Sequence, residues 1–401
     1  MRDVVITGLG CVSAAGYGAA ALWDAARAGR TQVRPIHLSR DIGLSVGIAA
    51  QVPDVEPQTA VPKAELANYD PFSRYAVLAA EEAVAQAGLD GELRGPRTAS
   101  IIGSGIGGFN TQDDGFYSIY AEKQRRSHPL TVPRSMPSAA ASHVGMRHGA
   151  QGPTFAVSSA CSSGAQAIGV GFDLIRAGVV DRAIVGGSEA CITPACMRAW
   201  ESMRVLSPDG SRPFSKGRNG MVLGEGAGVV VLEAAEVAEA RGATILARLL
   251  GYGTSSDARD LLRPDPDGSA ASMRNALESA GLAPEDVDYV NAHGTGTVLN
   301  DSAEAEGLRR AFGAHADRIA VSSTKPIHGH ALGASGALEL VLTIMALRDQ
   351  CAPPTANFLE ADPSCPLDVI PEGPRPMRMR AAMSNSFAFG GINAALVVGV
   401  A

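Results

Sequence analysis

The sequence predicts an α/β protein built from two similar halves, residues 1–242 and 243–401. Short apolar strands alternate with helical segments, an order typical of α/β folds with right-handed crossovers. The pattern restarts near Ala243, and Ile319–Ser323 (IAVSS) repeats Phe155–Ser159 (FAVSS). Each of these strands precedes a helix rich in glycine and alanine, which can pack closely between sheets. We therefore expect an internal duplication and a layered arrangement of helices and sheets.

In the first half, apolar runs that end in glycine predict strands, and caps predict helix starts. Asp70 and Pro71 are typical of a helix start, because aspartate caps the free N–H groups and proline fits the first turn. We predict strands at Val4–Gly10, Thr98–Ile102, Phe155–Val157, Asp181–Gly187 and Gly224–Leu232, helices at Leu22–Gly29, from Asp70–Pro71 to Gly88, from Cys161 to Gly178 and at Trp200–Leu206, and surface loops over 31–70.

The second half repeats the alternation with fewer insertions. We predict strands at Ile245–Gly251, Val287–Asn291, Ile319–Ser323, Ala381–Asn385 and Ala394–Val400, and helices at Gly268–Gly281, Ser302–Phe312 and Leu332–Leu347.

A glycine loop at Gly103–Gly108 resembles a dinucleotide-binding fingerprint only superficially. Its spacing is wrong, and no acidic residue follows at the required distance in a βαβ unit. We interpret it as a glycine-lined turn near a substrate. Residues 109–152 form a long excursion between strands, and such excursions tend to be functional or interfacial.

Composition narrows the function further. The 401 residues are 46% hydrophobic and carry a net charge of −7, with no dense basic face, which argues against a nucleic-acid binder. We expect no transmembrane helix and no signal peptide. The six cysteines show no CxxC pair, and the Cys191–Cys196 spacing is a weak metal signal, so we expect no metal, no cofactor and a reducing cytoplasm.

Cys161 is the first candidate catalytic residue. It follows a short strand and begins a segment with helical spacing, so it should lie at a sharp turn near a helix N-terminus. That position favours the thiolate and is expected to lower the thiol pKa. It can also direct backbone N–H groups at a developing oxyanion. The alternative is a buried structural cysteine, the usual fate of a free Cys.

Two histidines follow predicted strands of the second half. His293 begins the glycine-rich turn HGTGT, and His330 lies just before the second small-residue helix. A single histidine is more often structural than catalytic. A cysteine with two histidines from distant turns favours covalent acyl transfer, in which the thiol is the nucleophile.

Lys325 and Glu339 flank His330 in sequence. Glu339 lies in the apolar run ALELV, where a buried carboxylate needs a cationic partner, and Lys325 is the candidate. The alternative is a glutamate on a solvated helix face.

At these residues the chain resembles the elongating β-ketoacyl-acyl carrier protein synthases of the thiolase superfamily, over nearly its whole length. The matching segments are VVITGLGCVS (Val4–Ser13), SSACSSG around Cys161, SRPFSKGRNGMVLGEGAG (Ser211–Gly228), NAHGTGTVLND (Asn291–Asp301), STKPIHGHALGASGALE (Ser323–Glu339) and SNSFAFGGINA (Ser384–Ala394). The resemblance implies a duplicated thiolase fold with five layers, α-β-α-β-α, and a dimer. The Cys-His-His set differs from thiolases, which have a second catalytic cysteine, and from priming synthases, which resemble Cys-His-Asn.

The resemblance implies a decarboxylative condensation without a cofactor. Cys161 would take the acyl group from a carrier protein, and His293 and His330 would assist decarboxylation of malonyl-carrier protein. Lys325 and Glu339 would organise the histidines. The remaining implied sites are an oxyanion hole at the N–H groups of Cys161 and Phe389, a gate and acyl pocket at Phe389, Phe387, Ile106 and Trp200, and a docking surface for acyl carrier protein at Arg125, Arg126 and Arg204.

Several positions depart from the common fatty-acid pattern: His328 for Thr, Ala388 for Gly, Ile392 for Thr and Trp200 for Phe. They suggest a specialised synthase, for polyenes or another polyketide, acting as a homodimer or with a related chain-length-factor subunit. Ala388 could restrict the loop, since glycine adopts positive φ freely and alanine does not. The alternatives are a non-catalytic chain-length factor, which the intact Cys161 opposes, and a cysteine-dependent hydrolase or acyltransferase.

Overall fold

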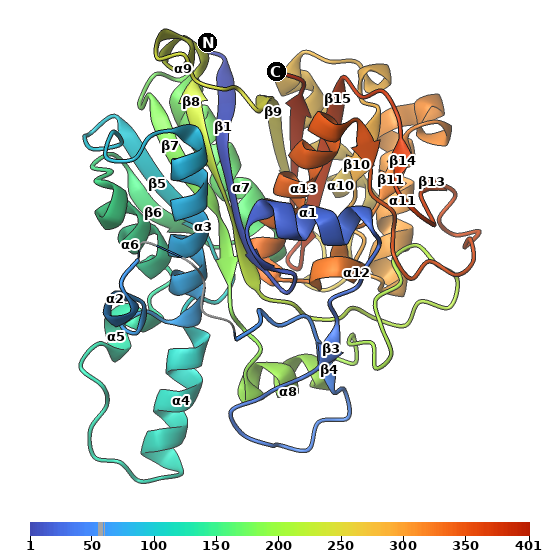
Figure 1. Ribbon diagram of the computed structural model, residues 1–401. Coiled ribbons are helices and arrows are strands. Elements are labelled where there is room, and N and C mark those ends of the chain that lie inside the picture. Colours follow the sequence, from blue (N-terminus) through green and yellow to red (C-terminus); the bar gives the residue numbers. More distant parts are fainter. Residues whose placement is uncertain (55–58, 60) are drawn as a thin grey trace.

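The computed structural model describes residues 1–54, 59 and 61–401, and folds them around a mixed sheet that runs through the whole molecule (Figure 1). Among these residues the main path of the sheet has the order β13-β11-β10-β15-β16-β9-β1-β8-β7-β5-β6, and β2 pairs with β1. Its strands are β1 (Val4–Ser13), β2 (Gly16–Tyr17), β5 (Thr98–Gly103), β6 (Thr154–Val157), β7 (Arg182–Glu189), β8 (Gly226–Ala234), β9 (Ala247–Ser256), β10 (Tyr289–Asn291), β11 (Ala320–Ser322), β13 (Asp368–Val369), β15 (Ala381–Ala388) and β16 (Ile392–Gly399).

The predicted duplication is confirmed by the order and direction of these strands. In the first half the strands lie in the order β6-β5-β7-β8-β1, and in the second half they lie in the order β11-β10-β15-β16-β9. In each set the first two pairings are parallel and the last two antiparallel. The two sets meet where β1 pairs with β9 over Val4–Ile6.

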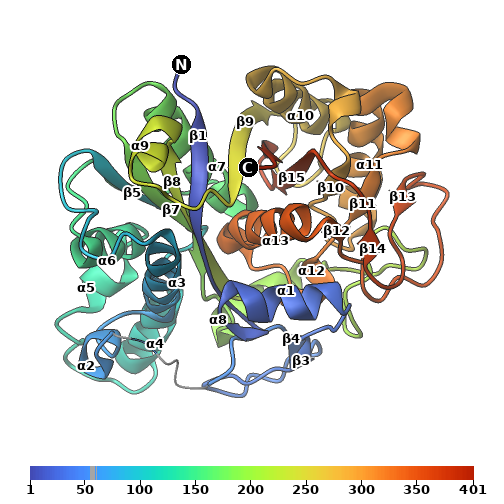
Figure 2. The ribbon, with the colours of Figure 1, turned by 45° about the horizontal axis from the view of Figure 1, so that its top comes forward.

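Helices cover the sheet in three layers, so the predicted α-β-α-β-α order is also confirmed. The central helices α7 (Ser163–Arg176) and α13 (Ser335–Asp349) lie between the two sets of strands (Figure 2). On the outside, α3 (Pro71–Ala87) and α6 (Ala139–His148) pack on the first set, and α10 (Pro266–Ala280) packs on the second with α11 (Val298–Phe312) beside it.

Small residues allow the central helices to pack closely. A Cβ added at Gly164 in α7 would lie 2.8 Å from the Gly333 carbonyl oxygen and 3.2 Å from the Ala337 Cβ. A Cβ added at Gly336 in α13 would lie 2.9 Å from the Ala165 Cβ. The glycine and alanine content of both helices therefore fits a buried central layer.

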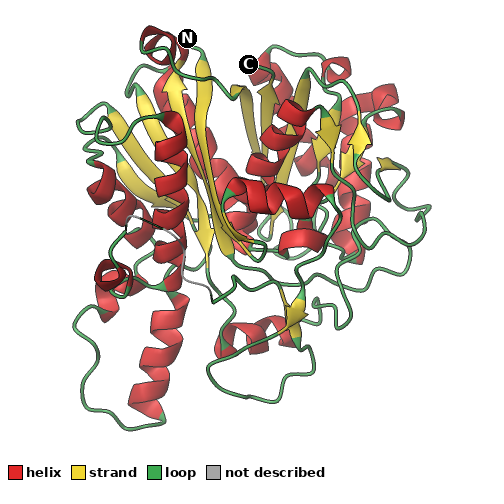
Figure 3. Ribbon diagram, in the orientation of Figure 1, coloured by secondary structure: helices red, strands yellow, loops and turns green. Residues whose placement is uncertain are grey.

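The other elements are shorter than the two central helices (Figure 3). They are the strands β3 (Arg34–Pro35), β4 (Ile48–Ala49), β12 (Cys351–Ala352) and β14 (Arg375–Pro376), the helices α1 (Ala19–Arg27), α2 (Lys63–Leu66), α4 (Phe109–Tyr120), α5 (Thr131–Ser135), α8 (Pro194–Ser202), α9 (Ala235–Ala240) and α12 (Lys325–His328), and the 3₁₀ turns η1 (Ala160–Ser162), η2 (Pro284–Asp286), η3 (Gly313–Asp317) and η4 (Leu332–Ala334). None of the helices in the described part of the chain is long and apolar enough to cross a membrane.

Local signals predicted some helix ends correctly, while several helix starts were misplaced by two to four residues. The Asp70 carboxylate accepts a hydrogen bond from the Phe72 N–H (3.2 Å), and Gly88 ends the same helix in the left-handed conformation. The helix predicted at Trp200–Leu206 was wrong, because α8 begins earlier, with Thr193 as its cap, and ends at Ser202. Arg204 has φ 56°, which stops the helix there.

Residues 31–70 were expected to be surface loops, and the structure differs in part. The described residues include the short hairpin β3–β4 and the helix α2. Ala49 and Ala50 are buried in this segment. Positions 55–58 and 60 of that expected loop lie outside the described residues.

Candidate active site

Cys161 lies in the turn that joins β6 to α7. Ala160 has φ 49°, a conformation that non-glycine residues seldom adopt, and it makes the turn sharp. The Ser163 hydroxyl donates to the Ala160 carbonyl (2.6 Å) and accepts from the Ser159 N–H (2.9 Å), which fixes the turn from within. The predicted strand–turn–helix position of Cys161 is confirmed, and the side chain is buried.

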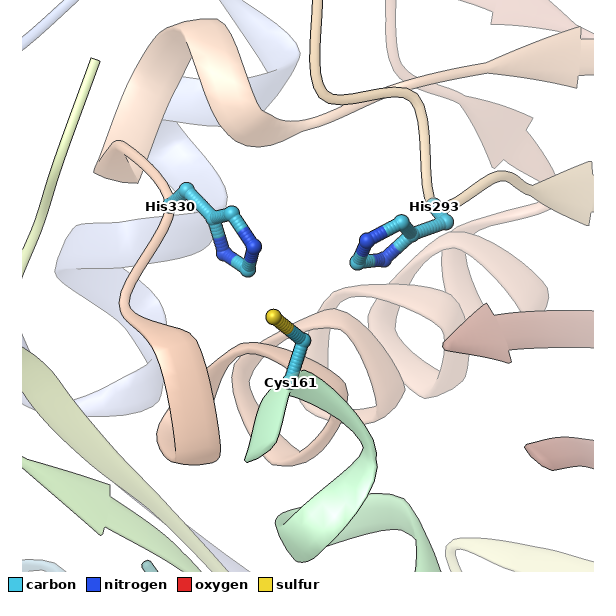
Figure 4. A group of neighbouring side chains, drawn as sticks. All are labelled: Cys161, His293 and His330. Carbon is cyan, nitrogen blue, oxygen red and sulfur yellow. The ribbon is translucent and has the colours of Figure 1, made fainter. Parts of the chain in front are cut away.

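The structure brings Cys161 together with the two predicted histidines. The cysteine sulfur and one ring nitrogen of each histidine all lie within 4.8 Å of one another. Figure 4 shows the sulfur facing the gap between the two rings, which come from separate segments after β10 and α12. The rings of His293 and His330 meet edge to face, with centroids 5.3 Å apart.

Glu304 of α11 holds the His293 turn in place. Its carboxylate accepts hydrogen bonds from the backbone N–H groups of His293 and Gly294, both at 2.7 Å. Burial raises the pKa of this carboxyl to about 7. The sequence analysis did not identify Glu304; the only signal was an acidic residue at a helical position after the HGTGT turn.

Lys325 and Glu339 form the predicted buried ion pair. The Lys325 ammonium also contacts the His293 carbonyl and lies 3.2 Å from His293 Nδ1. Because an ammonium can only donate, Nδ1 must accept, and the ring proton of His293 is on Nε2. The Glu339 backbone carbonyl accepts from the Asn291 side chain (3.1 Å), which anchors the pair to β10.

Both histidines are held in the neutral state. Burial, followed by the Lys325 charge, lowers the pKa of His293 and of His330 well below the ordinary value. The Ser335 hydroxyl lies 2.9 Å from His330 Nδ1, and a hydroxyl that donates there fits a His330 ring with its proton on Nε2. Neutral rings with N–H groups can donate to an oxygen that gains negative charge.

The expected low pKa of Cys161 is not found. Burial raises the pKa of the thiol to about 12, although the Lys325 charge lowers it in part. Burial removes the sulfur from water and raises the thiol pKa by more than the helix N-terminus lowers it. The backbone N–H groups of Phe389 and of Cys161 itself both lower the pKa by hydrogen bonding to the sulfur. These are the two donors expected for the oxyanion hole.

The cluster opens into a cavity of about 470 Å³. Cys161, His293, His330, Phe387, Phe389, Trp200 and Arg204 are among the residues that line it. The Trp200 and Phe389 rings stack with centroids 5.9 Å apart, and the Phe387 ring lies edge-on to His293 at 6.0 Å. The cavity therefore has an aromatic wall on the side of the sulfur.

The remaining predicted residues lie elsewhere. Ile106 does not line this cavity and packs instead in the apolar cluster that includes Cys161 and Trp200. Arg125 and Arg126 are exposed on the segment between α4 and α5 and are not among the residues that line the cavity. Arg204 is one of the residues that line the cavity.

Two of the departures from the family pattern, Ala388 and His328, have defined positions in the structure. Ala388 remains in β15 and pairs with Ile392, while Gly390 and Gly391 adopt the positive φ angles of the following turn. Ala388 therefore does not need a positive φ in this structure, and its effect on the mobility of the loop stays a prediction. His328 is fully buried, its Nε2 lies 3.1 Å from the Thr324 hydroxyl, and burial lowers its pKa to about 3.

The Cys161, His293 and His330 spacing would also suit a metal ion. The Lys325 ammonium beside His293 opposes a cation there, because like charges repel strongly in a buried site. The arrangement favours a thiol nucleophile served by two neutral N–H donors.

Comparisons with known proteins agree with this geometry. Residues 1–238 match the model "Beta-ketoacyl synthase, N-terminal domain", and residues 246–359 match "Beta-ketoacyl synthase, C-terminal domain". The chain is 46% identical over 396 residues to nodulation protein E of Rhizobium sp. (strain N33), covering 98% of each chain. It is 40% identical over 406 residues to 3-oxoacyl-(acyl-carrier-protein) synthase 2 of Coxiella burnetii (strain RSA 493 / Nine Mile phase I), covering 99% of this chain and 98% of the relative.

Among solved structures, the ishigamide ketosynthase/chain length factor superposes with a TM-score of 0.94 at 35% identity, over 100% of this chain and 99% of that one. Family models that cover most of the chain, relatives of matching length and a superposable fold all point the same way. The chain belongs to the β-ketoacyl synthase family.

Proposed function

We propose that this protein is a β-ketoacyl-acyl carrier protein synthase that extends an acyl chain by two carbons. The observation that carries the proposal is the Cys161 sulfur within 4.8 Å of a nitrogen from each of two neutral histidines, at a cavity large enough for an acyl thioester. The β-ketoacyl synthase relatives of matching length support it.

In the first half-reaction, the Cys161 sulfur attacks the carbonyl carbon of an acyl thioester on carrier protein. Its raised pKa keeps the thiol protonated at rest, and the thiol proton moves to the carrier-protein sulfur as that sulfur leaves. The new oxyanion accepts hydrogen bonds from the N–H groups of Cys161 and Phe389. Collapse expels the carrier-protein thiolate, which takes up the proton, and leaves the acyl group on Cys161.

In the second half-reaction, malonyl-carrier protein enters and loses CO2. The electron pair of the broken carbon–carbon bond becomes an enolate, whose oxygen accepts hydrogen bonds from the N–H groups of His293 and His330. The carbanion carbon then attacks the acyl carbonyl on Cys161. Expulsion of the Cys161 thiolate releases the β-ketoacyl-carrier protein, and the thiolate is reprotonated.

Lys325 and Glu339 act through His293 in this proposal. The ammonium holds Nδ1 as an acceptor, so that Nε2 stays a donor, and its charge disfavours protonation of the ring. Glu339 compensates the buried charge of Lys325. Phe389 would gate the cavity and, with Phe387 and Trp200, line the space for the acyl chain. Ile106 would act on that space from the apolar cluster that it shares with Trp200.

The partner in both half-reactions is acyl carrier protein, as in the name of the Coxiella relative. We assign its docking to Arg125, Arg126 and Arg204. We place the boundary between the two family halves at 242/243, between α9 and β9. We place the reaction in a reducing cytoplasm, which the six free cysteines support.

A second candidate is the catalytic subunit of a type II polyketide or polyene synthase, paired with a chain-length factor instead of a second copy of this chain. The similarity to the ishigamide ketosynthase/chain length factor favours it. A purely structural chain-length factor is disfavoured, because the nucleophile, both histidines and the cavity are all present.

The test is intact-protein mass spectrometry after mixing the protein with a panel of acyl-carrier proteins, followed by malonyl-carrier protein. We expect an acyl adduct on Cys161 that disappears into a product two carbons longer, with release of CO2. The Cys161→Ala variant should show no adduct. Release of free acid would indicate a hydrolase, and an adduct that never elongates would contradict the condensation.

A further inference from the structure

Glu189, the last residue of β7, is a fully buried carboxylate outside the proposed catalytic set. Its oxygens accept four hydrogen bonds, from Ser104 Oγ (2.9 Å) and from the backbone N–H groups of Gly105 (2.7 Å), Ile106 (3.3 Å) and Gly333 (3.0 Å). Within the described part of the chain, no Lys or Arg side chain forms an ion pair with it. Burial raises the pKa of this carboxyl to about 7, and the four donors lower the pKa only in part.

These donors come from both halves of the molecule. Ser104–Ile106 follow β5 in the first half, and Gly333 lies in η4 of the second, three residues after His330. A Cβ added at Gly333 would lie 2.4 Å from the Gly105 nitrogen and 2.7 Å from Glu189 Oε2. Glycine is therefore required at Gly333 for the two turns to meet on one carboxylate.

Cys161 lies beside this junction. A Cβ added at Gly105 would lie 3.8 Å from the Cα of Ala160, the residue before the nucleophile. Ile106 packs in the same apolar cluster as Cys161. The charged and titratable groups that face the sulfur are Lys325, which lowers the pKa of the thiol, Glu189, which raises it, and the two neutral histidines.

The site requires a carboxylate. Three of the four donors are backbone N–H groups, which cannot accept, and Ser104 Oγ already accepts from the Gly107 N–H (2.9 Å). A carboxamide would place its own N–H groups against these donors. The arrangement is therefore matched to negative charge.

We propose that Glu189 is a positioning residue that fixes the Ser104–Ile106 turn against the Gly333 turn, and so sets the reactivity of Cys161 and the approach of the acyl chain. The part that concerns the acyl chain rests on the proposed acyl transfer to Cys161. The part that concerns the thiol does not.

The first test is the pH dependence of Cys161 alkylation by iodoacetamide, followed by peptide mass spectrometry to separate Cys161 from the other cysteines. In Glu189→Gln the midpoint should move to lower pH by about one unit, because a nearby negative charge is removed. The matched control is Glu225→Gln. Glu225 is also a buried carboxylate with its pKa raised to about 7, but it accepts from the Val52 N–H (3.0 Å) and not from the turns beside Cys161.

The second test is the rate of acyl loading onto Cys161. Glu189→Gln and Ser104→Ala should both slow loading by at least about threefold at unchanged KM for the acyl-carrier protein, because each removes hydrogen bonds to a charged group. Ser104→Ala keeps the carboxylate, so its alkylation midpoint should not fall. This variant also tests the positioning role if Glu189→Gln does not fold.

The proposal requires both the shifted midpoint and the slower loading. An alkylation midpoint in Glu189→Gln equal to that of Glu225→Gln, or loading as fast as in the wild type, would overturn it. If the wild type accepts no acyl chain, the proposed function fails, while the alkylation experiment still decides whether Glu189 controls the thiol.

Discussion

The contact between Lys325 and His293 shows how one hydrogen bond fixes the state of a reactive side chain. The ammonium lies 3.2 Å from Nδ1 and can only donate, so the imidazole is neutral with its proton on the opposite nitrogen. Burial, and after it the same charge, lowers the pKa of both histidines. The buried Lys325 thus fixes the tautomer of His293 and helps to keep its ring neutral.

At the scale of single residues, one substitution should affect the two half-reactions to different extents. We expect His330→Ala to retain much of the acyl loading on Cys161 and to lose condensation by a factor of about 10² or more, because the proposed oxyanion donors of the loading step are backbone N–H groups. Intact-mass measurement of the adduct and product analysis would quantify both steps. Equal losses in the two steps would contradict the assigned role of His330.

His328 provides a prediction for stability against pH. Its pKa is about 3 in the folded protein and about 6.5 when unfolded, so the unfolded chain binds the extra proton first and stability falls as pH drops below 6.5. The penalty reaches about 2 kcal/mol at pH 5. We expect His328→Thr to lose less stability than the wild type between pH 7 and pH 5.

The measurement is denaturant unfolding at both pH values, with the exposed His37→Thr as the matched control. The control should lose as much stability as the wild type over this range. A His328→Thr variant that behaves like the control would show that the buried imidazole does not carry the penalty.

The sequence predicted the reactive residues better than their supports. Cys161 was proposed because it stands among small residues between an apolar run and a helical segment, and His293 and His330 because each lies beside glycines after a predicted strand. Glu189 was missed because the Gly333 turn that binds it is 144 residues away in sequence. Glu304 was missed because its role depends on α11 folding back onto the His293 turn, 11 residues earlier. The wrong thiol pKa has the same origin, since only the folded chain reveals how deeply the sulfur is buried.

At the scale of elements, the central helix pair positions the site. The turn before α7 carries Cys161, and the segment before α13 carries His330, so the packing of these helices sets the distance between sulfur and ring. The sequence predicted the glycine and alanine content of these helices as a packing feature. It did not predict the span of α8, because a positive φ at Arg204 and a threonine cap determine the ends of that helix.

Gly164→Ala tests this packing. The added Cβ would lie 2.8 Å from the Gly333 carbonyl oxygen, so the helices must separate, and we expect a loss of about 1–3 kcal/mol in unfolding free energy. The matched control is Gly145→Ala in α6, where the nearest atom would be at 3.5 Å and alanine favours the helix. Denaturant unfolding compares the two. Equal stabilities would mean that the central layer tolerates the extra methyl group.

At the scale of the whole molecule, the duplicated topology places the two parts of the site in different halves. The nucleophile comes from the first set of strands and both histidines from the second, and they meet across the central helix layer. The repeated IAVSS and FAVSS segments predicted the duplication into two halves. The continuity of the sheet through β1 and β9 could not be foreseen, because both strands read simply as the starts of two repeats.

The long excursion between β5 and β6 bears on how carrier protein reaches the site. Its exposed segment carries Arg125 and Arg126, while Arg204 lines the cavity itself. The protein has an overall charge of −7, so attraction of an acidic carrier depends on local basic groups and not on the net charge. Reversing Arg125 and Arg126 to Glu should therefore raise the KM for acyl-carrier protein by about tenfold, leave kcat nearly unchanged, and reduce the dependence of kcat/KM on salt.

The matched variant reverses Arg30 and Arg34, two exposed arginines away from that segment, and changes the net charge by the same amount. Kinetics at several salt concentrations compare the two. A rise in KM confined to the Arg125/Arg126 variant locates docking on the segment between α4 and α5. Similar rises in both variants would show that only net charge matters, and no rise in either would remove Arg125 and Arg126 from the docking surface and leave Arg204 as its basic group.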